Sequence, residues 1–170
     1  MVRVDLPEHW GTTAAERARR TPADDLVARP TDRWTRGATS TADPAVLWRW
    51  LCQLTVAPYS YDLVDNLGRR SPRTLTPGAD DLAVGQRLLI VFVIDSFVAG
   101  EHLTIRRRTT TGPVGEFAVT YAVHDDPAGS RLTATVVLDG THPVVGKALA
   151  WGDLVMMRRQ LTLLCDLAGR

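Results

Sequence analysis

The sequence predicts an α+β fold, in which a series of antiparallel strands is followed by one long C-terminal helix. Residues 85–138 contain stretches in which apolar and polar side chains alternate, separated by short turns, and this pattern is typical of an antiparallel meander. Residues 143–167 instead carry apolar side chains at helical spacing, in a wide stripe. Ahead of the meander, one strand and two short helices are predicted.

Residues 1–31 are predicted to form a polar N-terminal arm, and residues 32–170 one domain. The arm is rich in arginine and has too few apolar side chains for a core of its own. Thr12 or Thr13 can cap a short helix in the arm, because Glu16 then completes a capping box.

The first strand and the first helix of the domain lie next to each other in the chain. Side chains alternate over residues 32–40, which indicates a strand. Asp43 followed by Pro44 is a strong helix start, because aspartate caps a helix and proline fits its first position. The helix that follows has one apolar face, formed by Val46, Leu47, Trp50, Leu51 and Leu54.

A second short helix is predicted over residues 61–67. Ser60 can cap it, and Gly68 is suited to end it because glycine adopts the left-handed conformation common after a helix. The prolines and glycine in residues 69–83 leave room for at most a short strand near residues 73–75.

The meander begins with a β-rich stretch over residues 85–97, and a second strand is predicted over residues 101–110. A third covers residues 117–124, and a turn at residues 125–129 joins it to a fourth over residues 132–138. On the third strand, one face carries Phe117, Val119, Tyr121 and Val123.

The composition excludes several classes of protein. Lys plus Arg is 20 and Asp plus Glu is 19, a formal charge of +1, whereas a nucleic-acid-binding protein needs a clear basic excess. The longest uncharged apolar run, residues 88–94, is too short to span a membrane. We expect a cytoplasmic protein, because no secretory signal is visible and Cys52 and Cys165 fit reduced, buried thiols. Nineteen of the 20 basic residues are arginine, which indicates a GC-rich, bacterial genome.

Motifs for cofactors and metals are absent from the sequence. It has no glycine-lysine phosphate-binding loop, no GxGxxG motif and no GxSxG motif. Its four histidines lack the spacing of metal ligands. We therefore expect neither a cofactor nor a metal ion.

Five segments carry a resemblance to a known superfamily. They read TADPAVLWRWL (41–51), APYSYD (57–62), NLGRRSPR (66–73), LAVGQ (82–86) and ALAWGD (148–153). In order and spacing, they resemble the START-like or helix-grip superfamily, which includes the polyketide cyclases and is also called SRPBCC. The resemblance covers residues 32–168.

The resemblance implies a curved seven-stranded antiparallel sheet wrapped around the C-terminal helix, with an elongated apolar cavity between them. Members of the superfamily bind lipids, sterols, hormones or polyketides, and some cyclise or dehydrate a polyketide. The primary expectation is therefore that a small apolar molecule binds in the cavity. The alternatives are a polyketide aromatase/cyclase or dehydratase, and a START-like protein-interaction module, which would expose a large apolar patch outside the cavity.

A polar and aromatic cluster follows the first helix, and the resemblance places it at the cavity rim. It consists of Tyr59, Tyr61, Asp62, Asp65 and Asn66. In a ligand-binding role, a tyrosine hydroxyl and a carboxylate would fix the polar end of the ligand. Alternatively, the two tyrosines pack beneath the sheet and the acids face water.

The long helix contributes a second group of candidates. Gly152 weakens a helix interior, which suggests that a ligand or strand approaches closely there. Trp151 is predicted in the cavity wall. Asp153 either faces solvent or points inward, where burial would raise its pKa unless an arginine such as Arg69 or Arg70 pairs with it.

The candidate catalytic residues are Tyr61, Asp62 and Asp153. The predicted ligand-binding residues are Tyr59, Tyr61, Asp62, Asn66, Phe92, Tyr121, Trp151, Asp153 and Met157. Met157 and its neighbour Met156 suit either core packing or the cavity lining, since methionine fills irregular apolar space.

Overall fold

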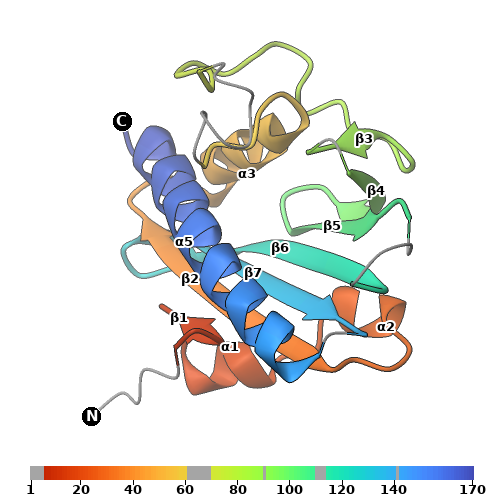
Figure 1. Cartoon of the computed structure of the whole chain (residues 1–170). Helices are drawn as coiled ribbons and strands as arrows, with labels where there is room; N and C mark the ends of the chain where they lie inside the picture. The colour runs from red at the N-terminus through yellow and green to blue at the C-terminus, as the bar shows by residue number, and fades with distance from the viewer. Residues whose placement is uncertain (1–5, 61–69, 90, 110–113, 141) are drawn as a thin grey trace.

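A seven-stranded sheet forms the centre of the computed structural model, which describes residues 6–60, 70–89, 91–109, 114–140 and 142–170 (Figure 1). The strand order is β1-β2-β7-β6-β5-β4-β3. The strands are β1 (His9–Trp10), β2 (Asp32–Ser40), β3 (Arg87–Leu88), β4 (Phe92–Val98), β5 (His102–Arg107), β6 (Phe117–Asp126) and β7 (Gly129–Leu138). The helices are α1 (Ala14–Ala18), α2 (Ala23–Leu26), α3 (Pro44–Cys52), a 3-10 turn (Gln53–Thr55) and α5 (Pro143–Ala168).

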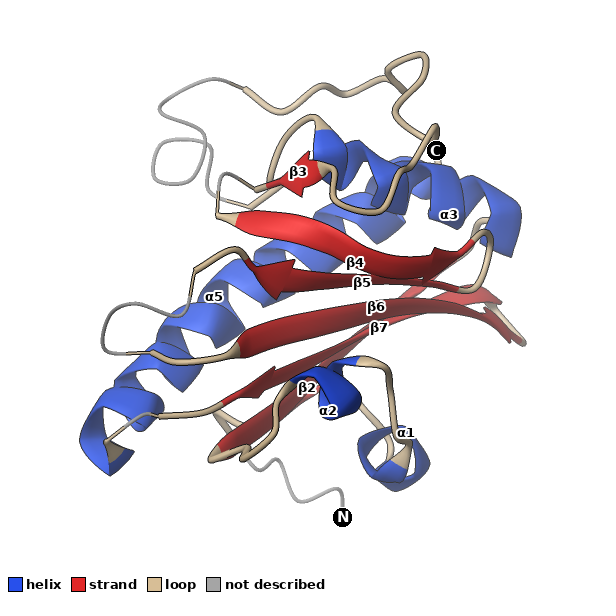
Figure 2. Ribbon diagram, turned by 90° about the vertical axis from the view of Figure 1, so that its right-hand side faces the viewer, coloured by secondary structure: helices blue, strands red, loops and turns tan. Residues whose placement is uncertain are grey.

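The two faces of the sheet are covered by different parts of the chain. The long helix α5 crosses the inner face, and α1 and α2 lie against the outer face (Figure 2). Because side chains alternate along each strand, Phe117, Val119 and Tyr121 of β6 point to the inner face, and the side chains between them point to the outer face. The main core therefore lies between the sheet, α3 and α5.

Local side-chain chemistry sets the helix starts that the sequence predicts. The Asp43 carboxylate accepts a hydrogen bond from the backbone N–H of Ala45 at 2.8 Å, and Pro44 occupies the first position of α3. In the arm, the Thr13 hydroxyl and the Glu16 carboxylate form the reciprocal bonds of a capping box around α1. These contacts satisfy N–H groups that have no partner within the helix.

The predicted fold class is confirmed, with differences in detail. Strand β1 comes from the arm and pairs with β2 in parallel, so the sheet is mixed. Residues 85–97 form two strands, β3 and β4, separated at Leu89, whose φ of 51° interrupts the extended backbone. No strand forms at residues 73–75. The predicted helix at residues 61–67 lies outside the described residues.

None of the described helices combines the length and the apolarity needed to cross a bilayer.

Candidate functional site

A cavity of about 400 Å³ lies between the inner face of the sheet and α5. It is walled mainly by apolar side chains from β4, β5, β6 and the helix. The lining residues are Pro58, Ser60, Leu89, Val91, Phe92, Ile105, Phe117, Val119, Tyr121, Asp153, Met156, Met157 and Gln160.

One side of α5 supplies the helical wall of the cavity. Asp153, Met157 and Gln160 are spaced by four and three residues, so they lie one above another on the same side of the helix. Two of the three are polar, so this wall brings hydrogen-bonding groups into an otherwise apolar space.

The register of the sheet explains why there is room for a polar group beneath α5. On the inner face, Arg36 of β2 lies opposite Ala134 of β7, and Ala134 lies opposite Tyr121 of β6. Alanine is the smallest side chain of this row. Its methyl group leaves space between the longer side chains of Arg36 and Tyr121, and Asp153 points from α5 towards this row.

A chain of hydrogen bonds links the sheet to α5 across one end of the cavity. The buried Tyr121 hydroxyl donates to Gln160 Oε1 at 2.9 Å, and Gln160 Nε2 donates to the carbonyl oxygen of Pro58 at 2.6 Å. The Tyr121 oxygen also lies 3.6 Å from the sulfur of Met157. Burial, and then the nearby Asp153 carboxylate, raise the pKa of Tyr121 well above its usual range, so the phenol stays protonated.

Arg36 and Asp153 form an ion pair at the cavity, with 2.9 Å between Nη2 and Oδ2. The Arg36 side chain is fully buried, and the Asp153 side chain is 16% exposed. Arg36 also donates through Nη1 to the backbone carbonyl oxygens of Glu8 at 2.6 Å and Thr35 at 3.1 Å. Carbonyl oxygens therefore share in stabilising the buried guanidinium.

Burial and the ion pair have opposite effects on the Asp153 carboxyl. Burial raises the pKa of Asp153, and the attraction of Arg36 lowers it by less, so that the pKa is about 6. Burial also lowers the pKa of Arg36, but from a value far above neutral pH, so this arginine keeps its charge near neutral pH. A carboxyl group with such a pKa can both give and take a proton under physiological conditions.

Four of the residues predicted from the sequence line this cavity: Phe92, Tyr121, Asp153 and Met157. Tyr59 does not line it. It is fully buried in the main core, where its ring packs edge-on against Trp50 with the ring centroids 6.2 Å apart. Tyr61, Asp62 and Asn66 lie outside the described residues.

The predicted position of Trp151 is wrong. Its side chain is 48% exposed and does not line the cavity. In α5, the buried side that faces the sheet includes Ala150, Leu154 and Met157. One residue advances the helix by about 100°, so Trp151 is turned away from that side.

Arg36 and Gln160 were not predicted as site residues. Arg36 shares one face of β2 with the apolar residues Trp34 and Ala38, two positions before and after it. This pattern could have indicated that the arginine points inward. In the described structure Asp153 pairs with Arg36, whereas Arg69, one of the two arginines predicted as its partner, lies outside the described residues. Gln160 gave no comparable signal, because a polar residue on a long helix usually faces water.

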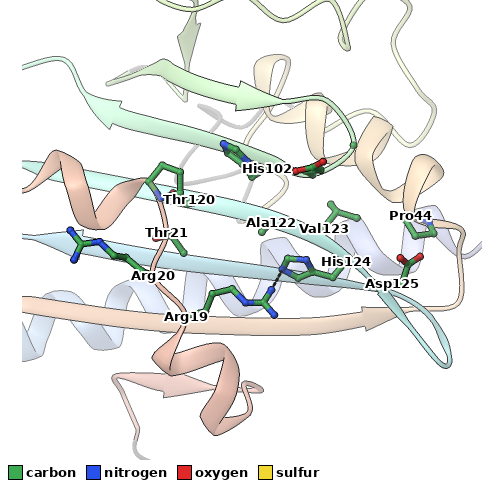
Figure 3. A pocket seen from close by; sticks show the side chains of 13 residues that line it. Arg19, Arg20, Thr21, Pro44, His102, Thr120, Ala122, Val123, His124 and Asp125 are labelled. Atoms are coloured by element: carbon green, nitrogen blue, oxygen red, sulfur yellow. Dashed lines mark hydrogen bonds between the residues drawn. The ribbon is translucent and has the colours of Figure 1, made fainter.

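Another hollow, of about 590 Å³, lies on the outer face between residues 19–22 of the arm and strands β5 and β6 (Figure 3). His124 belongs to this hollow and not to the inner cavity. Arg19 Nη1 donates to His124 Nε2 at 2.9 Å, and burial followed by the Arg19 charge lowers the pKa of His124. The charged groups here have both signs, and Arg20 is paired with Asp25. The hollow therefore has no surface of a single charge that would attract a charged ligand.

The described residues contain no group of His, Cys, Asp and Glu side chains that could hold a metal ion. Cys52 and Cys165 are both free and buried. Burial raises the pKa of each thiol to about 12, so both stay protonated and weakly nucleophilic.

Solved structures with a similar arrangement of elements show the fold. BexL, a di-domain ARO/CYC from the BE-7585A biosynthetic pathway, is 17% identical over 86% of this chain and 53% of its own, with a TM-score of 0.50. CV1439 of Chromobacterium violaceum is 14% identical over 81% of this chain and 97% of its own, also with a TM-score of 0.50. A protein of Arthrobacter aurescens is 12% identical over 84% and 91%, with the same TM-score.

The sequence matches no family model and no curated protein. At these identities, the structural similarity identifies the fold alone. The chain has the helix-grip fold that the sequence resemblance implies.

Proposed function

We propose that the protein binds a small, largely apolar molecule in the cavity between the sheet and α5. The observation that supports this most directly is the lining: Phe92, Ile105, Phe117, Val119 and Met157 provide apolar walls, and Tyr121, Asp153 and Gln160 are the polar groups. Small-molecule sites typically combine a mostly apolar wall with a few placed polar groups. The volume of about 400 Å³ suits a ligand of a few rings or a short chain.

The polar end of the cavity favours a ligand that donates a hydrogen bond. The hydroxyl proton of Tyr121 and one amide proton of Gln160 are already used within the protein. The Asp153 carboxylate lines the cavity with a side chain that is 16% exposed, and an ionised carboxylate can only accept hydrogen bonds. A hydroxyl, phenol or amine on the ligand would satisfy this acceptor, whereas an isolated ketone would not.

A thermal-shift screen tests this function. The panel would contain hydroxylated sterols, fatty acids and phenolic polycyclic compounds, each beside a ketone analogue. A ligand at 100 times its Kd stabilises the folded state by about 2.7 kcal/mol, which corresponds to a rise in Tm of roughly 5–10 °C for a chain of this size. Mass spectrometry of compounds that co-purify with the protein provides an independent readout.

Two neighbouring substitutions locate the site. Met156→Trp places a large ring in the lining and should abolish the shift, whereas Val155→Trp, on a side chain that does not line the cavity, should preserve it. Equal effects of the two substitutions, or a well-folded protein that responds to no compound and co-purifies with none, would contradict the proposal.

Acid–base catalysis is the second candidate function, and one observation favours it: Asp153, with a pKa of about 6, lies close enough to the Tyr121 hydroxyl to raise its pKa. Such a carboxyl could move a proton during a cyclisation or dehydration of a polyketide-like substrate, and BexL, an ARO/CYC, has the same fold. Asp153→Asn separates the two functions. A catalyst acting on a poly-β-keto thioester mimic would lose turnover and keep its affinity, whereas a binding protein would change in affinity only.

A further inference from the structure

The first half of α5 has a broad apolar side that no other part of the described structure covers. Its exposed side chains include Val144 at 72%, Val155 at 50% and Trp151 at 48%. We use the name α5 apolar face for the set of exposed residues Val144, Val145, Leu149, Trp151, Val155 and Met156. Apolar side chains gathered in this way usually mark a surface that contacts another molecule.

The helix geometry explains why this face is left uncovered. Gly146, Ala150, Leu154 and Met157 form the buried side of α5, and they follow one another at intervals of three or four residues, as one side of a helix does. The first turns of α5 also extend beyond the ends of the strands (Figure 2). The remaining circumference of these turns therefore faces solvent, although most of its side chains are apolar.

The charges on this part of α5 have one sign at the surface. Lys147, Arg158 and Arg159 are exposed, and Arg158 lies over the ring of Trp10 with 5.4 Å from Cζ to the ring centroid. Asp153 is the one acidic residue between positions 142 and 159. It is turned inward against Arg36, so this stretch of the helix presents cations and no exposed carboxylate.

The α5 apolar face is continuous with the candidate ligand cavity. Met156 belongs to both, since it is exposed and also lines the cavity. Val91, which lines the cavity from the opposite wall, is 49% exposed. An apolar surface docked on this face would therefore lie beside the opening of the cavity.

We infer that the α5 apolar face docks on a lipid surface that contains anionic headgroups, with α5 lying in the plane of the interface. Apolar side chains would enter the boundary of the acyl chains, and Lys147 and Arg159 would meet the headgroups. Trp151 has the amphipathic ring that is enriched at this depth. The inference does not depend on the proposed ligand, but together with it implies that a ligand could pass between the lipid and the cavity without crossing water.

A second copy of this chain is a poorer partner for the same face. In a twofold dimer the same patch meets itself, so the interface would gather Lys147 and Arg159 from both copies, with no exposed carboxylate from residues 143–159 of α5 to pair with them. An anionic lipid surface instead complements both the apolar side chains and the cations.

Vesicle co-sedimentation tests the inference, with no cavity ligand added. We expect the full chain to bind vesicles of phosphatidylcholine mixed with phosphatidylglycerol, to bind phosphatidylcholine alone more weakly, and to lose affinity as salt is added. The fluorescence of Trp151 should be quenched by brominated lipids. Trp151→Phe should remove most of this quenching, because Trp34, Trp48 and Trp50 are buried and the half-buried Trp10 lies beneath Arg158.

Matched substitutions separate the apolar and the electrostatic contributions. Leu149→Glu should weaken partitioning by roughly ten-fold or more, because it removes an apolar contact and adds a negative charge. Lys147→Gln should weaken it by roughly five-fold on anionic vesicles only. Val84→Glu, at a side chain that is 68% exposed outside α5, and Arg87→Gln on β3 are the controls and should bind like the parent. All four positions are at the surface, so the variants should fold.

Two results would overturn the inference. One is a folded parent protein that binds neither kind of vesicle. The other is self-association in sedimentation velocity that Leu149→Glu abolishes while vesicle binding is absent, which would assign the face to a second copy. Either result leaves the thermal-shift test of ligand binding unaffected, so the two proposals fail separately.

Discussion

Asp153→Ala leaves the guanidinium of Arg36 fully buried without its acidic partner. Removing one member of a buried ion pair usually costs about 3–5 kcal/mol, because the remaining charge has lost both water and its counter-charge. The carbonyl oxygens of Glu8 and Thr35 still accept hydrogen bonds from Arg36 in the variant. We therefore expect a loss near the lower limit, about 3 kcal/mol.

The loss should be visible in both heat and denaturant. For a chain of this size, about 3 kcal/mol lowers Tm by roughly 6–12 °C. Replacing both partners, as in Arg36→Met with Asp153→Leu, removes both buried charges and should return the free energy of unfolding to within about 1 kcal/mol of the parent. Urea unfolding at neutral pH of the parent, Arg36→Met, Asp153→Leu and the double variant gives the coupling energy between the two side chains directly.

The exposed ion pair between Arg106 and Asp95 is the matched control. Its distance is also 2.9 Å, but the two side chains are 53% and 25% exposed. Arg106→Met should therefore cost less than about 1 kcal/mol. The reasoning is refuted if Asp153→Ala unfolds within about 0.5 kcal/mol of the parent, or if the two single losses simply add in the double variant.

Three further predictions concern the same region and one turn. The pKa of Asp153 in the folded state, about 6, is above its unfolded value of 3.8, so the folded state binds this proton more tightly. This contribution to stability is fully present below pH 3.8 and is lost as pH rises through about 6. The protonated carboxyl still places a carbonyl oxygen beside Arg36, which Asp153→Ala removes. Urea unfolding as a function of pH measures the pH-dependent contribution, and the same slope in Asp153→Asn would assign it to another group. Tyr121→Phe removes the bond to Gln160 and should cost about 1 kcal/mol in urea unfolding, with no change expected in the sheet by circular dichroism. Gly129→Ala should cost about 2 kcal/mol or more, because φ is +135° and an added Cβ would lie 2.6 Å from the Ser40 carbonyl oxygen; a Tm equal to that of the parent would disprove this.

Local chemistry made most of the elements predictable. The cap at Asp43 with Pro44 after it, the capping box of Thr13 and Glu16, and the alternation along β6 act between neighbours in the chain. A short window of sequence therefore contains all the information they need. The same holds for the inward direction of Tyr121, which follows from its place in an alternating strand.

The features that could not be predicted have two causes. Some depend on contacts between segments that are distant in the sequence, and others lie where apolar residues occur on every side of a helix. Arg36 finds Asp153 only because β2 passes beneath α5, and the sequence indicated an arginine partner without identifying it. Trp151 was misplaced because apolar residues surround the first half of α5, so periodicity does not distinguish the side that faces the sheet. The pairing of β1 with β2 involves two residues per strand, too few to leave a signal.

That short strand β1 has a consequence for how the protein can be shortened. Without it, β2 would be the outermost strand on its side of the sheet and would present unpaired N–H and C=O groups to solvent. Such an edge can add a strand from another molecule, which is a common route to aggregation. The arm packs Ala23 and Val27 against Ala118 and Val137 of the sheet, and bonds from Arg131 to Glu16 and to the Gly11 carbonyl oxygen hold it in place. It thus shields the sheet from its neighbours. Removing residues 1–31 to obtain a smaller domain is expected to yield a chain that folds and then associates through β2.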